Sequence, residues 1–195
     1  MAIIQTARGP IPASELGFTI SHEHVLTSQG QDWKHYPWMF DHEATRRVAV
    51  QSLLEAKAAG VTAFIDLTTP DLGRDIEFFK AVAIEASYNI VCATGIWRDV
   101  PRSFWTRDLD QSADIFVREI EVGIEDSGVK AGVIKVENDE NELTPAHVNV
   151  LRAAARASKR TGCPISTHHW AVGEQGREQI RIFKEEGVQM DRVCI

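Results

Sequence analysis

Two histidines lie two residues apart in the segment Ser21-His22-Glu23-His24, at the end of a short apolar run that spans residues 18–24. In a β-strand, side chains two residues apart point to the same face, so both imidazoles can reach one metal ion. The competing interpretation is a pair of surface or hydrogen-bonded histidines. The C-terminal end of a first barrel strand, where active sites form, favours the metal.

Lys135 stands in the apolar run Gly132-Val133-Ile134-Lys135-Val136. A buried ammonium is costly, and desolvation lowers the pKa of a lysine, which leaves a nucleophilic amine. Such an amine can form a Schiff base, or it can take up CO₂ as a carbamate whose two oxygens bridge two metals. The competing interpretation is an ammonium that reaches out of the strand end to pair with Glu137 or Asp139.

A third candidate lies in Ser166-Thr167-His168-His169-Trp170, again at the end of an apolar run. Adjacent strand residues face opposite ways, so only one of His168 and His169 can point inward. The inward imidazole would suit zinc. The remaining histidines show no ligand spacing, and we expect them to face solvent: His35, His42 and His147.

Short apolar runs alternate along the chain with longer segments of helical spacing. We expect strands at residues 18–24, 61–67, 89–95, 130–136, 163–168 and 192–195. We expect helices at residues 41–59, 73–87, 110–124, 144–160 and 173–186. Such alternation is typical of a parallel α/β architecture, and all three candidate sites then lie where strands end.

Two parallel architectures compete, the doubly wound open sheet and the TIM (β/α)8 barrel. No GxGxxG motif follows the first strand and no P-loop occurs, whereas the long and varied loops after the strands suit a barrel. A complete barrel has eight units and about 250 residues. We therefore expect residues 1–195 to form a single, partial TIM-barrel domain of five to six β/α units.

Composition excludes several functional classes. The net charge of −7 and the scattered basic residues argue against a nucleic-acid surface. The N-terminus has no apolar signal-peptide region, and no run is long enough to span a membrane. The three cysteines lack a metal or disulfide pattern and are expected to be buried, reduced thiols: Cys92, Cys163 and Cys194. We expect a cytoplasmic protein.

At these residues the sequence resembles the phosphotriesterase family of the amidohydrolase superfamily. The segment GFTISHEHVL (residues 17–26) is similar to the first metal motif of that family. AGVIKV (131–136) is similar to the stretch with its carboxylated lysine, and TGCPISTHHW (161–170) to its fifth unit. The likeness covers nearly the whole chain.

The resemblance implies a binuclear metal site. His22 and His24 would bind the more buried metal, carboxylated Lys135 would bridge both, and His168 would bind the more exposed one. The metals would be zinc, with cobalt, iron or manganese as alternatives, and a bridging hydroxide would be the nucleophile. The substrate would be a small lactone, carboxylic ester or phosphotriester, and a homodimer is one assembly that we consider.

Two departures from the family pattern affect the interpretation. The family uses a further histidine after its sixth strand and an aspartate after its eighth, and residues 1–195 contain neither. Trp97 stands where family members place an aromatic residue after the third strand, so we expect it to form a hydrophobic wall for the substrate. Further aromatic residues in the loops could line the same pocket: Trp33, Trp38 and Trp105.

Two other functions compete with the hydrolase. The chain could be an inactive, truncated barrel that needs a complementary chain or an oligomer partner, because an open barrel leaves bare apolar strand edges. It could also be a Schiff-base lyase that uses Lys135 without metal. The lyase would leave the His22/His24 pair unexplained.

Overall fold

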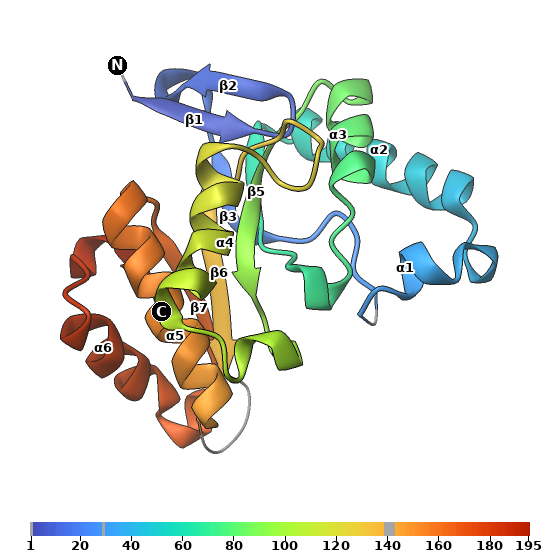
Figure 1. Cartoon of the computed structure of the whole chain (residues 1–195). Coiled ribbons are helices and arrows are strands. Elements are labelled where there is room, and N and C mark those ends of the chain that lie inside the picture. The colour runs from blue at the N-terminus through green and yellow to red at the C-terminus, as the bar shows by residue number, and fades with distance from the viewer. Residues whose placement is uncertain (1, 29, 139–142) are drawn as a thin grey trace.

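The computed structural model describes residues 2–28, 30–138 and 143–195. Its centre is a parallel sheet that curls into a partial TIM barrel (Figure 1). The strands follow one another in chain order: β3 (Thr19–Glu23), β4 (Ala63–Asp66), β5 (Asn89–Ile96), β6 (Val133–Asn138), β7 (Ile165–His169) and β8 (Val193–Cys194). The α/β fold class expected from the sequence is confirmed.

Helices follow the strands and pack against them. The helices are α1 (Asp32–His35), α2 (His42–Ala58), α3 (Ile76–Glu85), α4 (Leu109–Glu121), α5 (Pro145–Thr161) and α6 (Gln175–Glu185). Helices α2 and α3 lie beside the first half of the sheet, and α4, α5 and α6 lie beside the second half (Figure 1). Each of the five expected helices is present, and α1 is an additional short turn in the first aromatic loop.

Local capping explains where the best-predicted helices begin. The Asp41 carboxylate accepts the backbone N–H of Ala44 at the start of α2. Thr144 and His147 form a reciprocal capping box at the start of α5, where Pro145 occupies the first turn. The helix expected at residues 73–87 instead begins at Ile76, because Gly73 adopts a left-handed conformation that ends a preceding 3-10 turn.

An N-terminal hairpin was not expected from the sequence. It pairs β1 (Ile3–Thr6) with β2 (Gly9–Pro12) in antiparallel fashion. The N–H of Ala7 donates to the carbonyl of Ile90 at 2.7 Å, which places the hairpin at the end of the sheet where strands begin (Figure 1). Pro10 and Pro12 disfavour a strand locally, but prolines are tolerated at the edge of a sheet.

The two faces of the sheet carry different cores. Ile134 and Val136 of β6 pack in a large cluster with apolar residues of α4, α5 and α6. Val133 belongs to a smaller cluster with Leu67 and Ala93. Because strand side chains alternate, Lys135 lies on the face of Val133, away from the helices. This face is the interior of the partial barrel.

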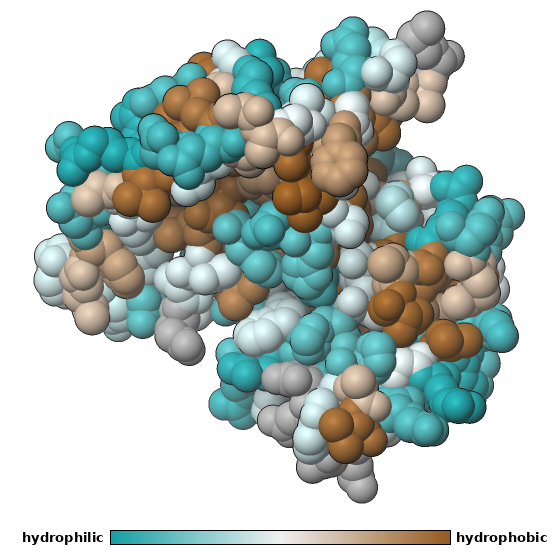
Figure 2. Space-filling view, turned by 180° about the vertical axis from the view of Figure 1, so that it is seen from behind, coloured by the Kyte–Doolittle hydropathy of each residue, from teal (hydrophilic) through white to brown (hydrophobic). Residues whose placement is uncertain are grey.

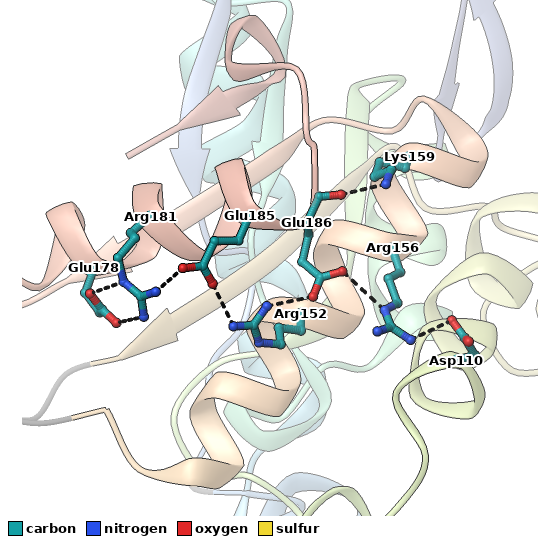
Figure 3. Close-up of polar contacts among 8 residues, drawn as sticks. All are labelled: Asp110, Arg152, Arg156, Lys159, Glu178, Arg181, Glu185 and Glu186. Atoms are coloured by element: carbon teal, nitrogen blue, oxygen red, sulfur yellow. Dashed lines mark hydrogen bonds and ion pairs between the residues drawn. The ribbon is translucent and has the colours of Figure 1, made fainter.

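Ion pairs join the outer surfaces of three helices (Figure 3). Glu186, directly after α6, accepts from Arg152 at 2.7 Å and from Arg156 at 3.3 Å, both on α5. Arg156 also pairs with Asp110 of α4 at 3.0 Å. Arg181 and its carboxylate partners extend the network along α6. The network fixes these helices to one another on the side that faces away from the sheet.

The edge of the sheet at β3 borders an apolar groove of about 640 Å³. Its apolar lining comes from β3 and the segment after it, from α2 and β4, and from the residue before β5: Ile20, Val25, Val48, Leu53, Phe64 and Tyr88. A space-filling view from behind shows apolar surface in a hollow on the α2 side of the molecule (Figure 2). Among the described residues, no helix is long and apolar enough to cross a membrane.

Candidate metal centre

The ends of the strands bring the candidate residues to one end of the sheet. In the register of the parallel sheet, Lys135 lies beside Ser166, which lies beside Cys194. Glu137 lies beside His168. Lateral neighbours in a sheet share a face, so these side chains belong to the barrel interior near its C-terminal end. Cys92 and Cys163 are buried as expected, but Cys194 is exposed because it lies on the edge strand β8.

The rings of His22 and His24 lie side by side, with their centroids 5.2 Å apart. Burial, together with the nearby charges of His22 and Lys135, lowers the pKa of His24 to about 4. Burial also lowers the pKa of His22, with added repulsion from Lys135 and His168. His22 is therefore within electrostatic reach of the other three candidate ligands, and burial favours the neutral form of both imidazoles of the pair.

Lys135 is 1% exposed, and its Nζ has no hydrogen-bond partner among residues 2–28, 30–138 and 143–195. Burial lowers the pKa of this lysine to about 8, although the charges of Glu137 and Cys194 act in the opposite direction. A side chain this deeply buried does not reach solvent, as an ammonium extending beyond the strand end would. Asp139, the other proposed partner, lies outside the described residues.

The structure separates the two adjacent histidines of β7. The ring of His169 faces α6, where its Nε2 would lie 3.0 Å from a Cβ placed on Gly176. His168 therefore points to the opposite face, toward the barrel interior. Gln179 of α6 donates to the carbonyl oxygen of His168 at 2.9 Å and also bonds Asn138. These contacts fix the backbone of the strand end that carries His168.

A partly buried polar network holds His24 in place, and no sequence motif indicated it. The hydroxyl of Thr68 lies 2.9 Å from Nδ1 of His24 and 3.5 Å from the carbonyl oxygen of Leu26. The Asp66 carboxylate accepts the N–H of Val25 at 2.7 Å and that of Thr68 at 2.8 Å. Burial raises the pKa of Asp66 to about 6, against the lowering effect of these hydrogen bonds.

The remaining histidines differ from one another in burial. His35 and His42 are exposed as expected, but the expectation for His147 was wrong. His147 is 7% exposed, and its Nε2 lies 3.3 Å from the carbonyl oxygen of Arg98. A residue that starts a helix is usually solvated, but here the loop after β5 covers it. That contact joins residues too distant in sequence for a local pattern to reveal.

The four tryptophans considered as pocket residues lie in different environments. Trp33 is buried against Phe40 and Phe78, and its Nε1 donates to Asp75 at 2.9 Å, so it packs between its own loop and the start of α3. Trp38 is 77% exposed and Trp105 is 53% exposed. Trp97 is half-buried directly after β5, at the same end of the sheet as the candidate ligands.

These residues fit a metal site in their chemistry. Within the described ranges, no group of three or more histidine, cysteine, aspartate or glutamate side chains is arranged to hold a metal. The buried amine of Lys135, which has no hydrogen-bond partner among these residues, can add a further ligand. Carboxylation of this amine would add two oxygen ligands to the nitrogen ligands that His22 and His24 offer a metal. The donor set is therefore suitable for divalent metal once Lys135 carries CO₂.

The comparisons with known proteins agree with this fold. The sequence pattern of the Phosphotriesterase family matches residues 2–195. The chain is 45% identical to a "Phosphotriesterase homology protein" of Mycobacterium tuberculosis over all of this chain and 63% of that protein. It is 36% identical to the "Aryldialkylphosphatase" of Saccharolobus solfataricus, again over all of this chain and 63% of the relative.

A solved structure gives the same result in three dimensions. The structure of the phosphotriesterase from Mycobacterium tuberculosis superposes with a TM-score of 0.92 at 44% identity. The match covers 98% of this chain and 62% of the solved chain. The chain thus spans somewhat less than two thirds of the length of these relatives.

Proposed function

Because the chain belongs to the phosphotriesterase family, we propose that it is a binuclear metal-dependent hydrolase that cleaves an ester-type bond. The substrate would be a small lactone, carboxylic ester or phosphotriester. The observation that carries the proposal is the buried amine of Lys135, which has no hydrogen-bond partner among the described residues and lies within electrostatic reach of the His22/His24 pair. We also propose that residues 1–195 form one domain and that the protein acts in the cytoplasm.

The residues would divide the work as follows. His22 and His24 would hold one divalent metal, carboxylated Lys135 would bridge it to a second, and His168 would hold the second. The metals, for which we propose zinc, would lower the pKa of water and polarise the carbonyl or phosphoryl oxygen of the substrate. Lys135 can accept CO₂ because burial keeps part of its amine neutral at physiological pH.

Thr68 would prepare His24 for this task. Its hydroxyl can donate to the carbonyl oxygen of Leu26 and accept a hydrogen bond from the Nδ1–H of His24. Such an arrangement leaves the lone pair of Nε2 available for metal. Trp97, at the end of β5, would provide an apolar wall against which the substrate packs.

Hydrolysis assays test the proposal. The purified chain is stripped of metal with a chelator, reloaded with zinc or cobalt in bicarbonate buffer, and assayed with an aryl ester, a lactone and an aryl phosphotriester. We expect turnover of at least one substrate class that is lost in the double variant His22→Asn/His24→Asn. Absence of metal-dependent turnover in the reloaded chain would contradict the proposal for this polypeptide.

A second candidate is an inert partial barrel that needs a complementary chain or an oligomer partner. The observation that favours it is that, in the described sheet, β3 pairs only with β4 and β8 only with β7. An apolar groove also borders β3. Under this alternative the reloaded chain would be folded but inactive. Its mass in solution would show assembly with another polypeptide. A metal-free lyase is disfavoured because it gives the paired histidines no role.

A further inference from the structure

One carboxylate receives three consecutive backbone amides of the loop after β5. Asp71 lies in the 3-10 turn Pro70–Leu72 that follows β4. Its Oδ1 accepts the N–H of Trp97 at 3.0 Å, and its Oδ2 accepts those of Arg98 at 2.8 Å and Asp99 at 3.0 Å. Hydrogen bonds to an ionised carboxylate are stronger than neutral ones, so the contact defines the path of this loop.

The turn that carries Asp71 is itself fixed. The Thr69 hydroxyl donates to Oδ1 of Asp71 at 2.6 Å, and Thr69 is fully buried. The N–H groups of Leu72 and Arg74 both donate to the carbonyl oxygen of Thr69. The carboxylate therefore approaches the loop from a rigid support at the C-terminal end of the neighbouring strand.

The same loop is held from its other side. The ring of His147, at the start of α5, bonds the carbonyl oxygen of Arg98 at 3.3 Å. The guanidinium of Arg98 lies over the indole ring of Trp97, 4.7 Å from the ring centroid. Directly before the loop, Gly95 approaches the backbone of Lys135 so closely that a Cβ would collide with its carbonyl oxygen. Contacts thus hold the loop at Gly95, at the backbone N–H groups of residues 97–99 and at the carbonyl oxygen of Arg98.

We propose that Asp71 is the positioning residue that sets the place of Trp97, and with it the apolar wall of the substrate pocket. The part of this inference that concerns substrate rests on the hydrolase proposed above. Asp71 acts through the backbone of residues 97–99 and need not touch the substrate. Its removal should change which substrates fit more than it changes the rate of the chemical step.

Asp71→Asn tests the contact with little change in shape. An amide has one acceptor oxygen, and its NH₂ group would face backbone N–H groups that it cannot pair with. The matched control is Asp108→Asn, because Asp108 also accepts two backbone amides, those of Asp110 and Gln111 at the start of α4. Both variants remove one carboxylate charge and disturb backbone hydrogen bonds, but only the first affects the loop.

Amide hydrogen exchange measured by mass spectrometry gives the direct readout. In Asp71→Asn we expect exchange at residues 97–99 to accelerate by about tenfold or more, since about tenfold corresponds to the loss of one net hydrogen bond. Exchange at the start of α4 should stay unchanged in this variant and should accelerate in Asp108→Asn. Unchanged protection of residues 97–99 in Asp71→Asn would overturn the inference.

Fluorine NMR of protein labelled with 5-fluorotryptophan follows the indole itself. The Trp97 resonance is assigned by its disappearance in Trp97→Phe. In Asp71→Asn this resonance should move or broaden while the resonances of the other four tryptophans keep their positions. A change spread over all tryptophans, or none at Trp97, would count against a specific positioning role. Neither this readout nor the exchange measurement depends on bound metal.

Kinetics then separate this inference from the proposed function. With a hydrolysed substrate, Asp71→Asn should raise KM by about tenfold and leave kcat within about threefold, as expected when binding contacts are lost. If kcat and kcat/KM fell by the same factor, the inference that Asp71 positions the apolar wall of the substrate pocket would be overturned. If the wild-type chain hydrolyses nothing, the proposed function fails, and the exchange and fluorine data still decide whether Asp71 positions Trp97.

Discussion

At the scale of single residues, the contact between Thr68 and His24 joins the candidate metal site to the buried network behind it. Thr68→Val removes the hydroxyl with almost no change in volume. We expect zinc affinity to fall by about 10–100-fold, the range typical for loss of a hydrogen bond that orients a metal-bound histidine. Competition with a chromophoric chelator measures it. Thr68→Ser, which keeps the hydroxyl, should retain most of the affinity, and equal affinities in all three proteins would refute the role of Thr68.

Asp66 gives a second prediction at this scale, on stability against pH. Burial raises the pKa of Asp66 from 3.8 to about 6, so between these pH values the folded chain holds a proton that the unfolded chain has lost. Stability from this group is therefore present at low pH and is lost as the pH rises from about 4 to 6. A shift of this size corresponds to about 3 kcal/mol.

The effect of Asp66 is isolated by comparison with Asp66→Asn, because His24, whose pKa is lowered to about 4, makes stability change in the opposite direction. Urea denaturation at several pH values should show the wild-type chain losing about 3 kcal/mol relative to the variant between pH 4 and pH 6.5. Parallel stability curves for the two proteins would show that Asp66 does not titrate in this way.

The candidate metal ligands could be predicted from the sequence because each lies within or at the end of a short apolar run that is recognisable by itself. Strand alternation placed His22 and His24 on one face and allowed only one of His168 and His169 to point inward. The family resemblance selected His168, and in the structure it is His169 that turns toward α6. Their role as ligands stays a prediction. The supporting residues escaped notice because their contacts join distant segments: Asp71 meets residues 97–99, and His147 meets Arg98.

At the scale of strands and helices, Gly95 allows β5 to approach β6 closely. Its φ of 121° is unfavourable for other residues, and a Cβ would collide with the backbone carbonyl of Lys135. Gly95→Ala should therefore push apart the two strands that carry Trp97 and Lys135. We expect it to lower the free energy of unfolding by about 3 kcal/mol or more, the upper range for overpacking.

Gly60→Ala is the matched control for this prediction. Gly60 also has a positive φ, 91°, but nothing lies within 4 Å of a Cβ placed there. Only the backbone strain remains, which costs about 1–2 kcal/mol. Urea denaturation of both variants measures the difference. If Gly95→Ala were no more destabilising than Gly60→Ala, the close approach of the strands would not be what requires glycine.

The elements that the sequence predicted well are those with local signals. The capping residues of α2 and α5 and the apolar runs of β5 and β6 are visible in short windows. The hairpin of β1 and β2 was missed because Pro10 and Pro12 disfavour a strand locally, and only its place at the edge of a two-stranded sheet makes them acceptable.

At the scale of the whole molecule, two features predict that the chain associates with itself. One is the groove beside β3, and the other is that β3 and β8 each pair with only one strand in the described sheet. Val48 of α2 lines the groove and is 66% exposed. We expect the mass in solution, measured by light scattering, to rise above 21.8 kDa with concentration. Val48→Lys should weaken this association. Val122→Lys changes a valine that is 61% exposed and does not line the groove, so it should have no effect.

A constant mass equal to the monomer, or equal effects of the two substitutions, would show that the groove does not mediate contact between copies. The sequence had predicted bare strand edges from the count of β/α units. It did not predict the groove, because its lining combines residues from β3, β4 and α2 that only the fold brings together.

The metal content of the purified chain tests the central claim most directly. Elemental analysis is performed after reloading with zinc in bicarbonate and removal of loose metal, on the wild-type chain and on His22→Asn/His24→Asn. We predict about two equivalents of zinc per wild-type chain, as for other two-metal hydrolytic sites, and a loss of at least one equivalent in the variant. No stoichiometric zinc in the wild-type chain, or the same amount in both proteins, would contradict the assignment of this site.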